Sequence, residues 1–307
     1  MVTRIGIIGV SEGNGHPYSF SSIINGYDDK GLARSGWEGI YNYVRVRDKS
    51  EFGFGNLRVT HVWTQDESET KKLCEAALIS CPVKNYNDML GNIDAVIIAR
   101  DDYEMHFEIA RPFLENNLPV FIDKPLSLNI EELKYFKTFL ENGKLMSCSG
   151  LRYAKELDTV RGNIMDYGKN LLVRGTVLFS WEKYGIHMLE GILSLLQSRP
   201  VSVSSLPAYH MSVMIRMADN SQIQIDALGN VPKIFKIDVI GNKKTSTYEI
   251  TDNFSMFRRM LWHFAFMIET EKPPIPPHQT LDIIKILIAG NLSRKEEREV
   301  LLDEFDV

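Results

Sequence analysis

The sequence predicts an α/β protein with an N-terminal doubly wound parallel sheet and a C-terminal α+β domain whose open sheet is mainly antiparallel. Three observations support this fold class. Short apolar runs alternate with helical segments up to residue 150, as in βαβ units. A glycine-rich turn follows the first run directly, which is typical of a Rossmann domain. Strand-like runs separated by turn residues follow one another after residue 150.

The N-terminal half, residues 1–150, is expected to be the dinucleotide-binding Rossmann domain. Its apolar runs are typical of parallel strands with both faces covered. Strands are predicted over 4–10, 57–63, 82–86, 93–99, 119–122 and 145–150. Helices are predicted over 18–25, 67–79, 103–116 and 130–142, with another beginning at 86–90. Residues 27–56 are polar and rich in glycine and aromatic residues without a clear period, so we expect an insertion that lids a crevice or joins a subunit contact.

The C-terminal half, residues 151–307, is expected to be a second domain of the α+β class. Helices are predicted over 155–167, 186–196, 255–270 and 278–289. Extended segments are predicted over 170–180, 201–205, 210–217, 222–228, 233–240 and 245–250. The proline-rich residues 273–277 separate the last two helices. These strands predict an antiparallel sheet with one open face.

The composition excludes several classes of protein. A formal net charge of -5 argues against a general nucleic-acid binder, whose binding face would be basic. The three cysteines form no CxxC pair, so neither a disulfide framework nor a metal site is expected. No apolar stretch reaches 18 residues and no signal peptide is recognisable, so we expect no membrane partner and a cytoplasmic location.

The turn after the first strand is the candidate phosphate-binding turn. In that position backbone N–H groups and a helix N-terminus meet a dinucleotide pyrophosphate, and glycines permit the close approach. The candidate cofactor-binding residues are Gly9, Ser11, Gly13, Asn14 and Gly15. In strict GxGxxG register Ser11 and Asn14 replace the second and third glycines, so a plain βα turn is the alternative interpretation.

The end of the second predicted strand should contact the adenosine ribose. An acidic residue there favours NAD, because it accepts a hydrogen bond from the 2′-hydroxyl. Thr64 lies where that acid is expected, and Asp66 follows two residues later. No arginine stands beside them to hold a 2′-phosphate, although Lys71 and Lys72 follow. The cofactor is therefore NAD or NADP, with NAD slightly favoured.

The segment Val120-Phe121-Ile122-Asp123-Lys124-Pro125 predicts an active-site lysine. A lysine at the C-terminal end of a parallel strand faces the ligand crevice of a doubly wound sheet. The alternative is a surface lysine at a strand end.

The order of the motifs gives the sequence a family resemblance. The series contains the strand 93–99, His106, the strand that leads to Asp123-Lys124-Pro125, and Gly150-Leu151-Arg152-Tyr153. It resembles the Gfo/Idh/MocA family, named for glucose–fructose oxidoreductase, inositol dehydrogenase and a rhizopine-catabolism protein. The resemblance is strong over residues 1–153 and weaker beyond. The family's usual motif is Glu-Lys-Pro, of which Asp-Lys-Pro is a close variant.

The resemblance implies site residues in both halves. It places His187 as the general acid/base, with Lys183 where the family has an aspartate, which is a departure. Arg100, Asp101 and Asp102 are a second departure, since the family commonly has a small residue and a proline there. Two interpretations stay open: these charges contact cofactor or substrate, or they cap the helix that contains His106. Lys124, His187 and Lys183 are the catalytic candidates, and Arg152 and Tyr184 the substrate-binding ones. The further cofactor-binding candidates are Ala99, Arg100, Asp101, His106, Asp123 and Lys124.

The resemblance also implies a function. We expect an NAD(P)-dependent oxidoreductase that transfers a hydride between nicotinamide and a secondary alcohol of a sugar, inositol or sugar derivative. A homo-oligomer, dimeric or tetrameric through the C-terminal sheet, is implied as well. Two alternatives stay open: a non-catalytic dinucleotide-binding sensor, which the loss of the aspartate at Lys183 favours, and a redox-neutral enzyme with tightly bound NAD.

Overall fold

The structure, a computed structural model, describes residues 2–307, with the side chains of 170 and 171 excepted. The chain divides into two compact units, each of which combines distant segments of the sequence. Unit 1 comprises the chain up to Ser127 together with Tyr135–Ser147 and Phe257–Ile275. Unit 2 comprises Leu128–Lys134, Cys148–Met256 and Pro276–Val307.

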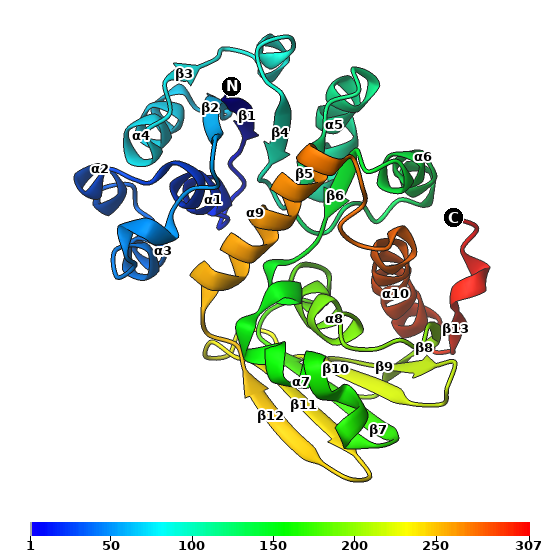
Figure 1. Ribbon diagram of the computed structural model, residues 1–307. Helices are drawn as coiled ribbons and strands as arrows, with labels where there is room; N and C mark the ends of the chain where they lie inside the picture. The colour runs from blue at the N-terminus through cyan, green and yellow to red at the C-terminus, as the bar shows by residue number, and fades with distance from the viewer. Residues whose placement is uncertain (1) are drawn as a thin grey trace. The chain divides into compact units, whose positions relative to one another are not determined.

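Unit 1 contains a six-stranded parallel sheet in the order β3-β2-β1-β4-β5-β6 (Figure 1). Its strands are β1 Thr3–Ile8, β2 Leu57–Trp63, β3 Cys81–Pro82, β4 Ala95–Ile98, β5 Val120–Ile122 and β6 Leu145–Ser147. This is the doubly wound order, so the predicted Rossmann sheet is confirmed. The strand order reverses beside β1, and the carboxyl ends of β1, β4 and β5 therefore meet at the edge where such sheets bind ligands.

Unit 1 also contains helices, some of which pack on the sheet and some on other helices. They are α1 His16–Asn25, α2 Asp29–Ala33, α3 Glu38–Val44, α4 Glu67–Ala77 and α5 His106–Glu115, with short 3₁₀ turns at Lys49–Glu51, Tyr86–Met89 and Tyr103–Met105. Two longer helices, α6 Ile130–Glu141 and α9 Asn253–Thr270, contribute residues to both units. In the core, the Phe121 ring of β5 lies 6.1 Å from that of Phe20 in α1 and 5.8 Å from that of Phe264 in α9. Helix α9, although late in the sequence, therefore contributes to the core of the unit 1 sheet.

Residues 27–56, expected to lack regular structure, instead fold into α2 and α3. Asp28 caps α2 by accepting a hydrogen bond from the Gly31 N–H at 2.7 Å. A Cβ at Gly31 would lie 3.1 Å from backbone atoms of Glu75 and Ala76, so glycine permits α2 to pack closely on α4. Each helix has at most seven residues, which is too short to produce a clear apolar period.

Unit 2 contains a seven-stranded sheet in the order β12-β11-β7-β10-β9-β8-β13. Its strands are β7 Asn170–Val177, β8 Pro200–Leu206, β9 Met211–Met217, β10 Gln222–Ala227, β11 Phe235–Gly241, β12 Thr245–Glu249 and β13 Val300–Leu301. The β7–β10 pair is parallel and the other pairs are antiparallel, so the predicted mainly antiparallel sheet is confirmed.

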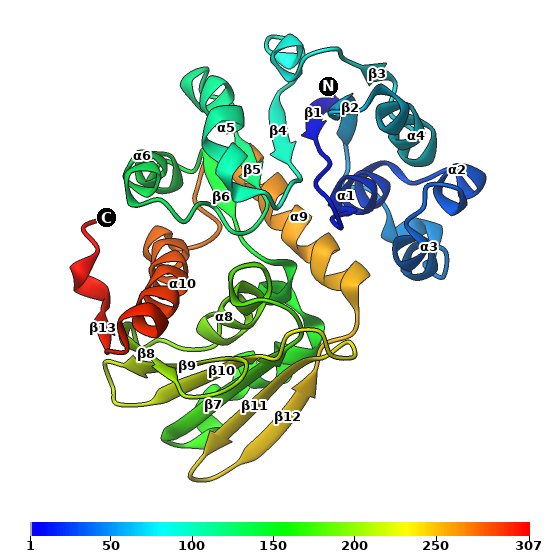
Figure 2. The ribbon, with the colours of Figure 1, turned by 180° about the vertical axis from the view of Figure 1, so that it is seen from behind.

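Two helices lie on one face of this sheet, α8 Ile186–Leu193 and α10 Pro277–Glu296 (Figures 1 and 2). A π-helical turn, Trp181–Gly185, leads directly into α8. Gly175 of β7 lies under α8, and a Cβ there would lie 2.9 Å from Met188, which explains a glycine within a strand. The indole N–H of the buried Trp181 donates to Leu287 O of α10 at 3.0 Å, which joins the two helices.

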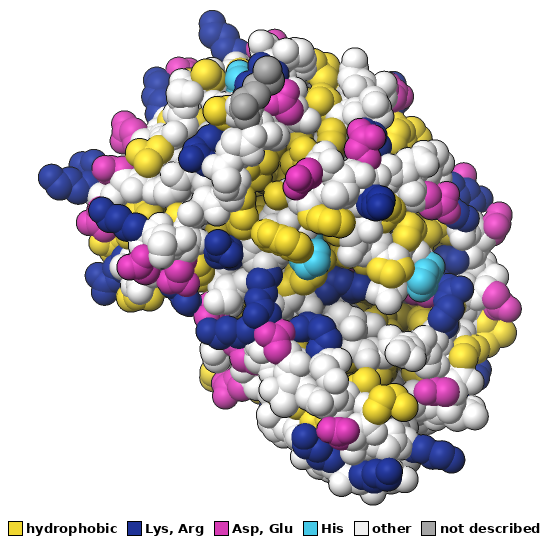
Figure 3. Space-filling view, viewed as in Figure 1, with side chains coloured by type: hydrophobic (Ala, Val, Ile, Leu, Met, Phe, Trp, Pro, Cys, Tyr) yellow, Lys and Arg dark blue, Asp and Glu magenta, His cyan; other side chains and the backbone are white. Residues whose placement is uncertain are grey.

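Several predicted boundaries differ from the structure. The helix expected over 155–167 is three short pieces: a 3₁₀ turn Lys155–Leu157, α7 Asp158–Asn163 and a second 3₁₀ turn Ile164–Tyr167. The last helix is longer than expected, and the two-residue strand β13 was missed. No helix among residues 2–307 combines the length and the apolar character needed to cross a membrane. Figure 3 shows acidic and basic side chains interspersed over one face of the molecule.

The polar side of the unit 2 sheet contains a buried carboxylate, Asp226 of β10, with 2 % exposure. It accepts hydrogen bonds from Arg174 at 2.8 Å and Ser212 at 2.7 Å, and its Oδ1 lies 3.0 Å from His210 Nε2. Burial opposes ionisation, but the hydrogen bonds from Ser212, His210 and Arg174 outweigh it and lower the pKa of Asp226. The carboxylate therefore joins β7, β9 and β10.

We predict that Asp226→Asn destabilises the protein by about 1–3 kcal/mol at pH 7, because charge-assisted hydrogen bonds are lost. The folded-state pKa lies below the unfolded value of about 3.9, so the stabilisation is complete above that value. It declines as the pH falls through the folded value. Urea unfolding from pH 7 to 3 should therefore show the difference between wild type and variant shrinking toward acid. The matched control is Asp238→Asn on β11, and a constant difference across this range would contradict the assignment.

Candidate functional site

The candidate phosphate turn of unit 1 lies between β1 and α1, as predicted. Its glycines are required for different reasons. A Cβ at Gly9 would lie 2.2 Å from Pro17, and one at Gly15 would lie 2.5 Å from Trp37. Gly13 has φ +76°, a left-handed conformation that glycine adopts without strain. The turn therefore keeps its shape through close packing and one left-handed residue.

Lys124 follows β5 and is buried, with 4 % exposure. Its Nζ lies 3.7 Å from Oδ2 of Asp101, which follows β4 and is also buried. The turn after β1 fixes Asp101 through two hydrogen bonds. Ser11 Oγ donates to Asp101 Oδ1 at 2.6 Å, and the Asp101 backbone N–H donates to Ser11 Oγ at 3.0 Å. The structure thus brings three predicted site residues, from three strand ends, into one hydrogen-bonded and ion-paired group.

Asp123 is the second buried carboxylate of this edge, with 2 % exposure. Its Oδ2 lies 2.6 Å from His16 Nδ1 and accepts a hydrogen bond from Asn14 Nδ2 at 2.9 Å. Burial opposes ionisation of Asp123, but His16, Lys124 and Asn14 together hold the pKa of its carboxyl well below the usual range. His16 was missed by the sequence analysis, although its place at the start of α1, directly after Gly15, was a usable signal.

The residues after β4 form a second cluster. The Arg100 guanidinium is buried and pairs with Asp102, its Nε lying 2.8 Å from Oδ1. His106 is fully buried, with ring nitrogens 2.9 Å from Arg100 O and 3.1 Å from Leu126 O. His106 therefore links the segments that follow β4 and β5. The preceding residue Ala99 is buried and donates its N–H to Ile8 O at 2.8 Å.

The end of β2 contains the predicted ribose-contacting residues. Thr64 is buried, and its hydroxyl donates to Asp66 O at 2.7 Å. Asp66 caps α4 by accepting from the Ser68 N–H at 2.6 Å. Gln65 was missed: its side chain makes two hydrogen bonds with the Val10 backbone, at 2.9 and 2.7 Å, and so connects the β2 end with the phosphate turn.

In unit 2 the candidate base His187 lies in the first turn of α8. Its Nδ1 lies 2.6 Å from Ser149 Oγ, a partner that the sequence analysis missed. Tyr184 packs beside it, with ring centroids 5.4 Å apart. Lys183 lies half-buried in the π-helical turn, where its backbone N–H donates to Ser180 Oγ at 3.4 Å.

Arg152 is buried and forms an ion pair with Glu190 of α8 at 2.8 Å. It also donates to Gln279 of α10. Burial raises the pKa of Glu190, and the guanidinium opposes that rise. Arg152 therefore connects α8 and α10 within unit 2, and its predicted contact with substrate stays a prediction.

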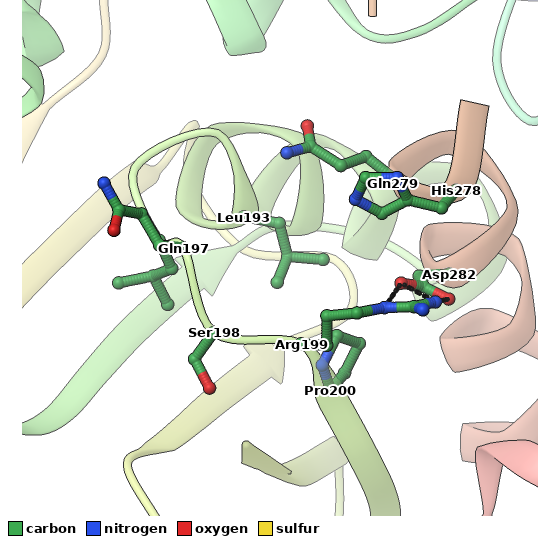
Figure 4. A pocket seen from close by; sticks show the side chains of 9 residues that line it. Leu193, Gln197, Ser198, Arg199, Pro200, His278, Gln279 and Asp282 are labelled. Carbon is green, nitrogen blue, oxygen red and sulfur yellow. Dashed lines mark hydrogen bonds and ion pairs between the residues drawn. The ribbon is translucent and has the colours of Figure 1, made fainter. Parts of the chain in front are cut away.

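A small hollow of unit 2 lies at the C-terminal end of α8 (Figure 4). Its volume of about 30 Å³ is enough for one or two water molecules. The Arg199 guanidinium at its rim points to Asp282, with a shortest N–O distance of 2.9 Å (Figure 4). Among the described residues, no group of histidine, cysteine and acidic side chains is arranged to hold a metal ion.

Comparison with known proteins identifies the dinucleotide-binding part. Residues 31–149 match GFO_IDH_MocA, described as an oxidoreductase family with an NAD-binding Rossmann fold. This part of the chain is therefore similar to the Gfo/Idh/MocA family. The match contains Lys124, Asp123 and the segment after β4, and it confirms the expected family and its NAD-binding fold. No curated protein matches the chain.

Solved structures share the fold of the whole chain. A myo-inositol 2-dehydrogenase from Lactobacillus plantarum has a TM-score of 0.78 at 15% identity, covering 98% of this chain and 99% of its own. A scyllo-inositol dehydrogenase from Lactobacillus casei, solved with NAD(H) and scyllo-inositol, has a TM-score of 0.76 at 13% identity, covering 99% and 100%. A probable dehydrogenase from Thermotoga maritima has a TM-score of 0.75 at 15% identity, also covering 99% and 100%.

The pairing of His16 with Asp123 gives a prediction for unit 1. In a double-mutant cycle of His16→Asn and Asp123→Asn, we expect a coupling energy of about 1–3 kcal/mol, since the two groups share one short contact. Urea unfolding of the four proteins at pH 7 measures it. The control is the exposed pair Glu67 and Lys71 on α4, whose coupling should stay below about 0.5 kcal/mol. Additive effects of the His16 and Asp123 variants would show that the contact does not stabilise the turn.

Proposed function

We propose that this protein is an NAD-dependent oxidoreductase acting on a secondary alcohol of an inositol, sugar or sugar derivative. The proposal depends on one observation. Lys124 is only 4 % exposed, although it lies at the carboxyl edge of a doubly wound sheet. An ordinary strand-end lysine extends into water, because burying its charge is costly. The described relatives, among them an inositol dehydrogenase solved with NAD(H) and its substrate, support the substrate class.

The residues of the β1–α1 turn fit a dinucleotide. The turn runs from Gly9 to Gly15 and ends at the N-terminus of α1, a ten-residue helix that favours an anionic ligand. Thr64 and Asp66 would lie toward the adenosine ribose, and the lack of an arginine in Trp63–Glu67 favours NAD slightly over NADP. Ala99, Arg100 and His106 would border the cofactor from β4. Bound nicotinamide supplies the hydride acceptor or donor.

Lys124 acts on the reacting oxygen in this proposal. Its ammonium donates a hydrogen bond to that oxygen and stabilises the negative charge that develops there. Asp101 and Asp123 compensate the buried positive charge and hold the lysine in place. Because both carboxylates are themselves fixed by Ser11, Asn14 and His16, the ammonium is preorganised before substrate binds.

His187 moves the proton of the substrate hydroxyl in this proposal. Ser149 engages Nδ1, and we assign proton exchange to Nε2. Tyr184 and Arg152 are proposed to position substrate, and Lys183 stands where the family has an aspartate. A second ammonium there would attract a carboxylate or phosphate on the substrate. We further propose a homo-oligomer that forms through the open face of the unit 2 sheet.

A non-catalytic dinucleotide sensor is the second candidate. The observation that favours it is Lys183 at the position of the family's aspartate. The two functions are separated by incubating the purified protein with NAD+ and polyols, sugar acids and nucleotide sugars while NADH absorbance is followed. Tight NAD binding with no turnover on any of these compounds supports the sensor.

Lys124→Met tests the oxidoreductase directly. We expect turnover to fall about 10³-fold, because charge stabilisation at the reacting oxygen is lost. The readout is the rate of NADH formation, with NADH affinity measured separately by calorimetry. Lys71→Met, on the exposed face of α4, should keep full activity. Wild-type rates in Lys124→Met would rule out the assigned role.

Ser149→Ala and His187→Asn test the proposed base. We expect His187→Asn to lower kcat about 10²- to 10⁴-fold, the usual contribution of general acid–base catalysis. Ser149→Ala should lower kcat less, since the imidazole is retained but its orientation is less fixed. The pH–rate profile of the residual activity should lose one limb in His187→Asn and keep it in Ser149→Ala. Identical profiles for wild type and His187→Asn would exclude His187 as the base.

A further inference from the structure

We propose that Phe179, Tyr184 and Phe235, here called the aromatic wall, bind the C–H face of a ring-shaped polyol or sugar. The inference rests on the proposed function, since it narrows the substrate class of that site. It also assigns specificity to two residues, Phe179 and Phe235, that the sequence analysis did not select.

The aromatic wall is a continuous set of ring contacts around His187. The Phe179 and Tyr184 rings are 4.8 Å apart at 67°, and the Tyr184 and His187 rings are 5.4 Å apart at the same angle. The Phe235 ring lies 5.6 Å from His187 and 6.2 Å from Tyr184. Two aromatic rings therefore touch the imidazole of the proposed base directly. A ligand whose hydroxyl reached His187 would lie next to aromatic surface.

The exposure of these rings distinguishes them from a core cluster. Phe179 is 42% exposed, and Tyr184 and Phe235 are half-buried. Phe235 begins β11, in which Ile237 and Val239, on the same side of the strand, are buried. The aromatic wall therefore extends the apolar face of the sheet to solvent-exposed surface, and it lies next to the proposed base His187. Apolar surface with a few polar groups is the usual composition of a small-molecule site.

The backbone of Phe179 gives a second, independent observation. Its φ is +59°, a left-handed conformation that is costly for a bulky residue. Two backbone hydrogen bonds with Gly229 hold it there: Phe179 N donates to Gly229 O at 2.6 Å, and Gly229 N donates to Phe179 O at 3.1 Å. The residue is 42% exposed, and its side chain packs in part, against the Tyr184 ring. Strained backbone conformations of this kind cluster at ligand-binding positions.

The chemistry of the wall favours a ring over an open chain. A cyclic polyol presents several C–H groups on one face and its hydroxyls around the rim, so an aromatic ring can contact the face while the base contacts the rim. An open-chain polyol exposes hydroxyls on all sides and must also be immobilised. Loss of one such aromatic contact is expected to weaken binding of the ring by about three- to tenfold.

Saturation-transfer NMR tests the wall without requiring turnover. Protein aromatic protons are irradiated in the presence of NADH, with myo-inositol and methyl β-D-glucopyranoside as ring probes and sorbitol as the open-chain probe. We expect strong transfer to the ring C–H protons and weak transfer to sorbitol.

Phe179→Asn should weaken ring binding about three- to tenfold. Its Tm should stay equal or rise, because asparagine tolerates the left-handed conformation. Tyr209→Ala, at an exposed aromatic of the same unit, is the matched control.

The outcomes separate this inference from the proposed function. Absence of transfer to both ring probes, equal transfer to sorbitol, or unchanged ring affinity in Phe179→Asn would overturn the wall. If NADH formation depends on Lys124 but the ring affinity of Phe179→Asn is unchanged, the role of the aromatic wall is disproved and the oxidoreductase function is kept. If ring binding weakens in Phe179→Asn but the protein reduces no NAD+ with any polyol, the role of the aromatic wall is supported and the oxidoreductase function is disproved.

Discussion

The burial of the Lys124 ammonium is the constraint on which the carboxyl edge of unit 1 depends. Removing a charge from water costs several kcal/mol unless opposite charges and hydrogen bonds compensate it. Asp101 lies 3.7 Å from the ammonium, and Asp123, the preceding residue, is ionised and buried beside it. Each carboxylate is then fixed by the turn after β1, Asp101 by Ser11 and Asp123 by Asn14 and His16. The turn, the β4 end and the β5 end therefore form one electrostatic unit.

This arrangement gives a physical reason for the departures from the family pattern. Where the family commonly has a small residue and a proline, Arg100, Asp101 and Asp102 supply a buried ion pair and the carboxylate that faces Lys124. Unit 2 follows the same principle: Arg152 and Glu190 compensate each other in the core, while Ser149, three residues before Arg152, engages the proposed base. In both units, buried charges are paired and hydrogen-bonded around the group to which chemistry is assigned.

The sequence predicts most of the strands because buried parallel strands are short apolar runs bounded by turn residues, as in residues 93–99, which contain β4. The sequence predicts Lys124 as a site residue because this charged residue follows a buried apolar strand almost directly. It does not predict α2 and α3, whose few residues show no period, or β13, whose two residues pair with β8 only after the chain has folded. His16, Gln65 and Ser149 were missed for a related reason. Their partners lie between 38 and 107 positions away, so only the tertiary fold reveals them.

We propose that the buried ammonium of Lys124 faces the reacting carbon of a bound nicotinamide. A crystal structure of the protein with NADH measures this directly. We expect the pyrophosphate at the turn from Gly9 to Gly15 and the Lys124 Nζ on the side of the nicotinamide C4 atom, with room for one substrate oxygen between them. A nicotinamide ring bound away from the β5 end, or a lysine side chain turned from the ring into solvent, would contradict it.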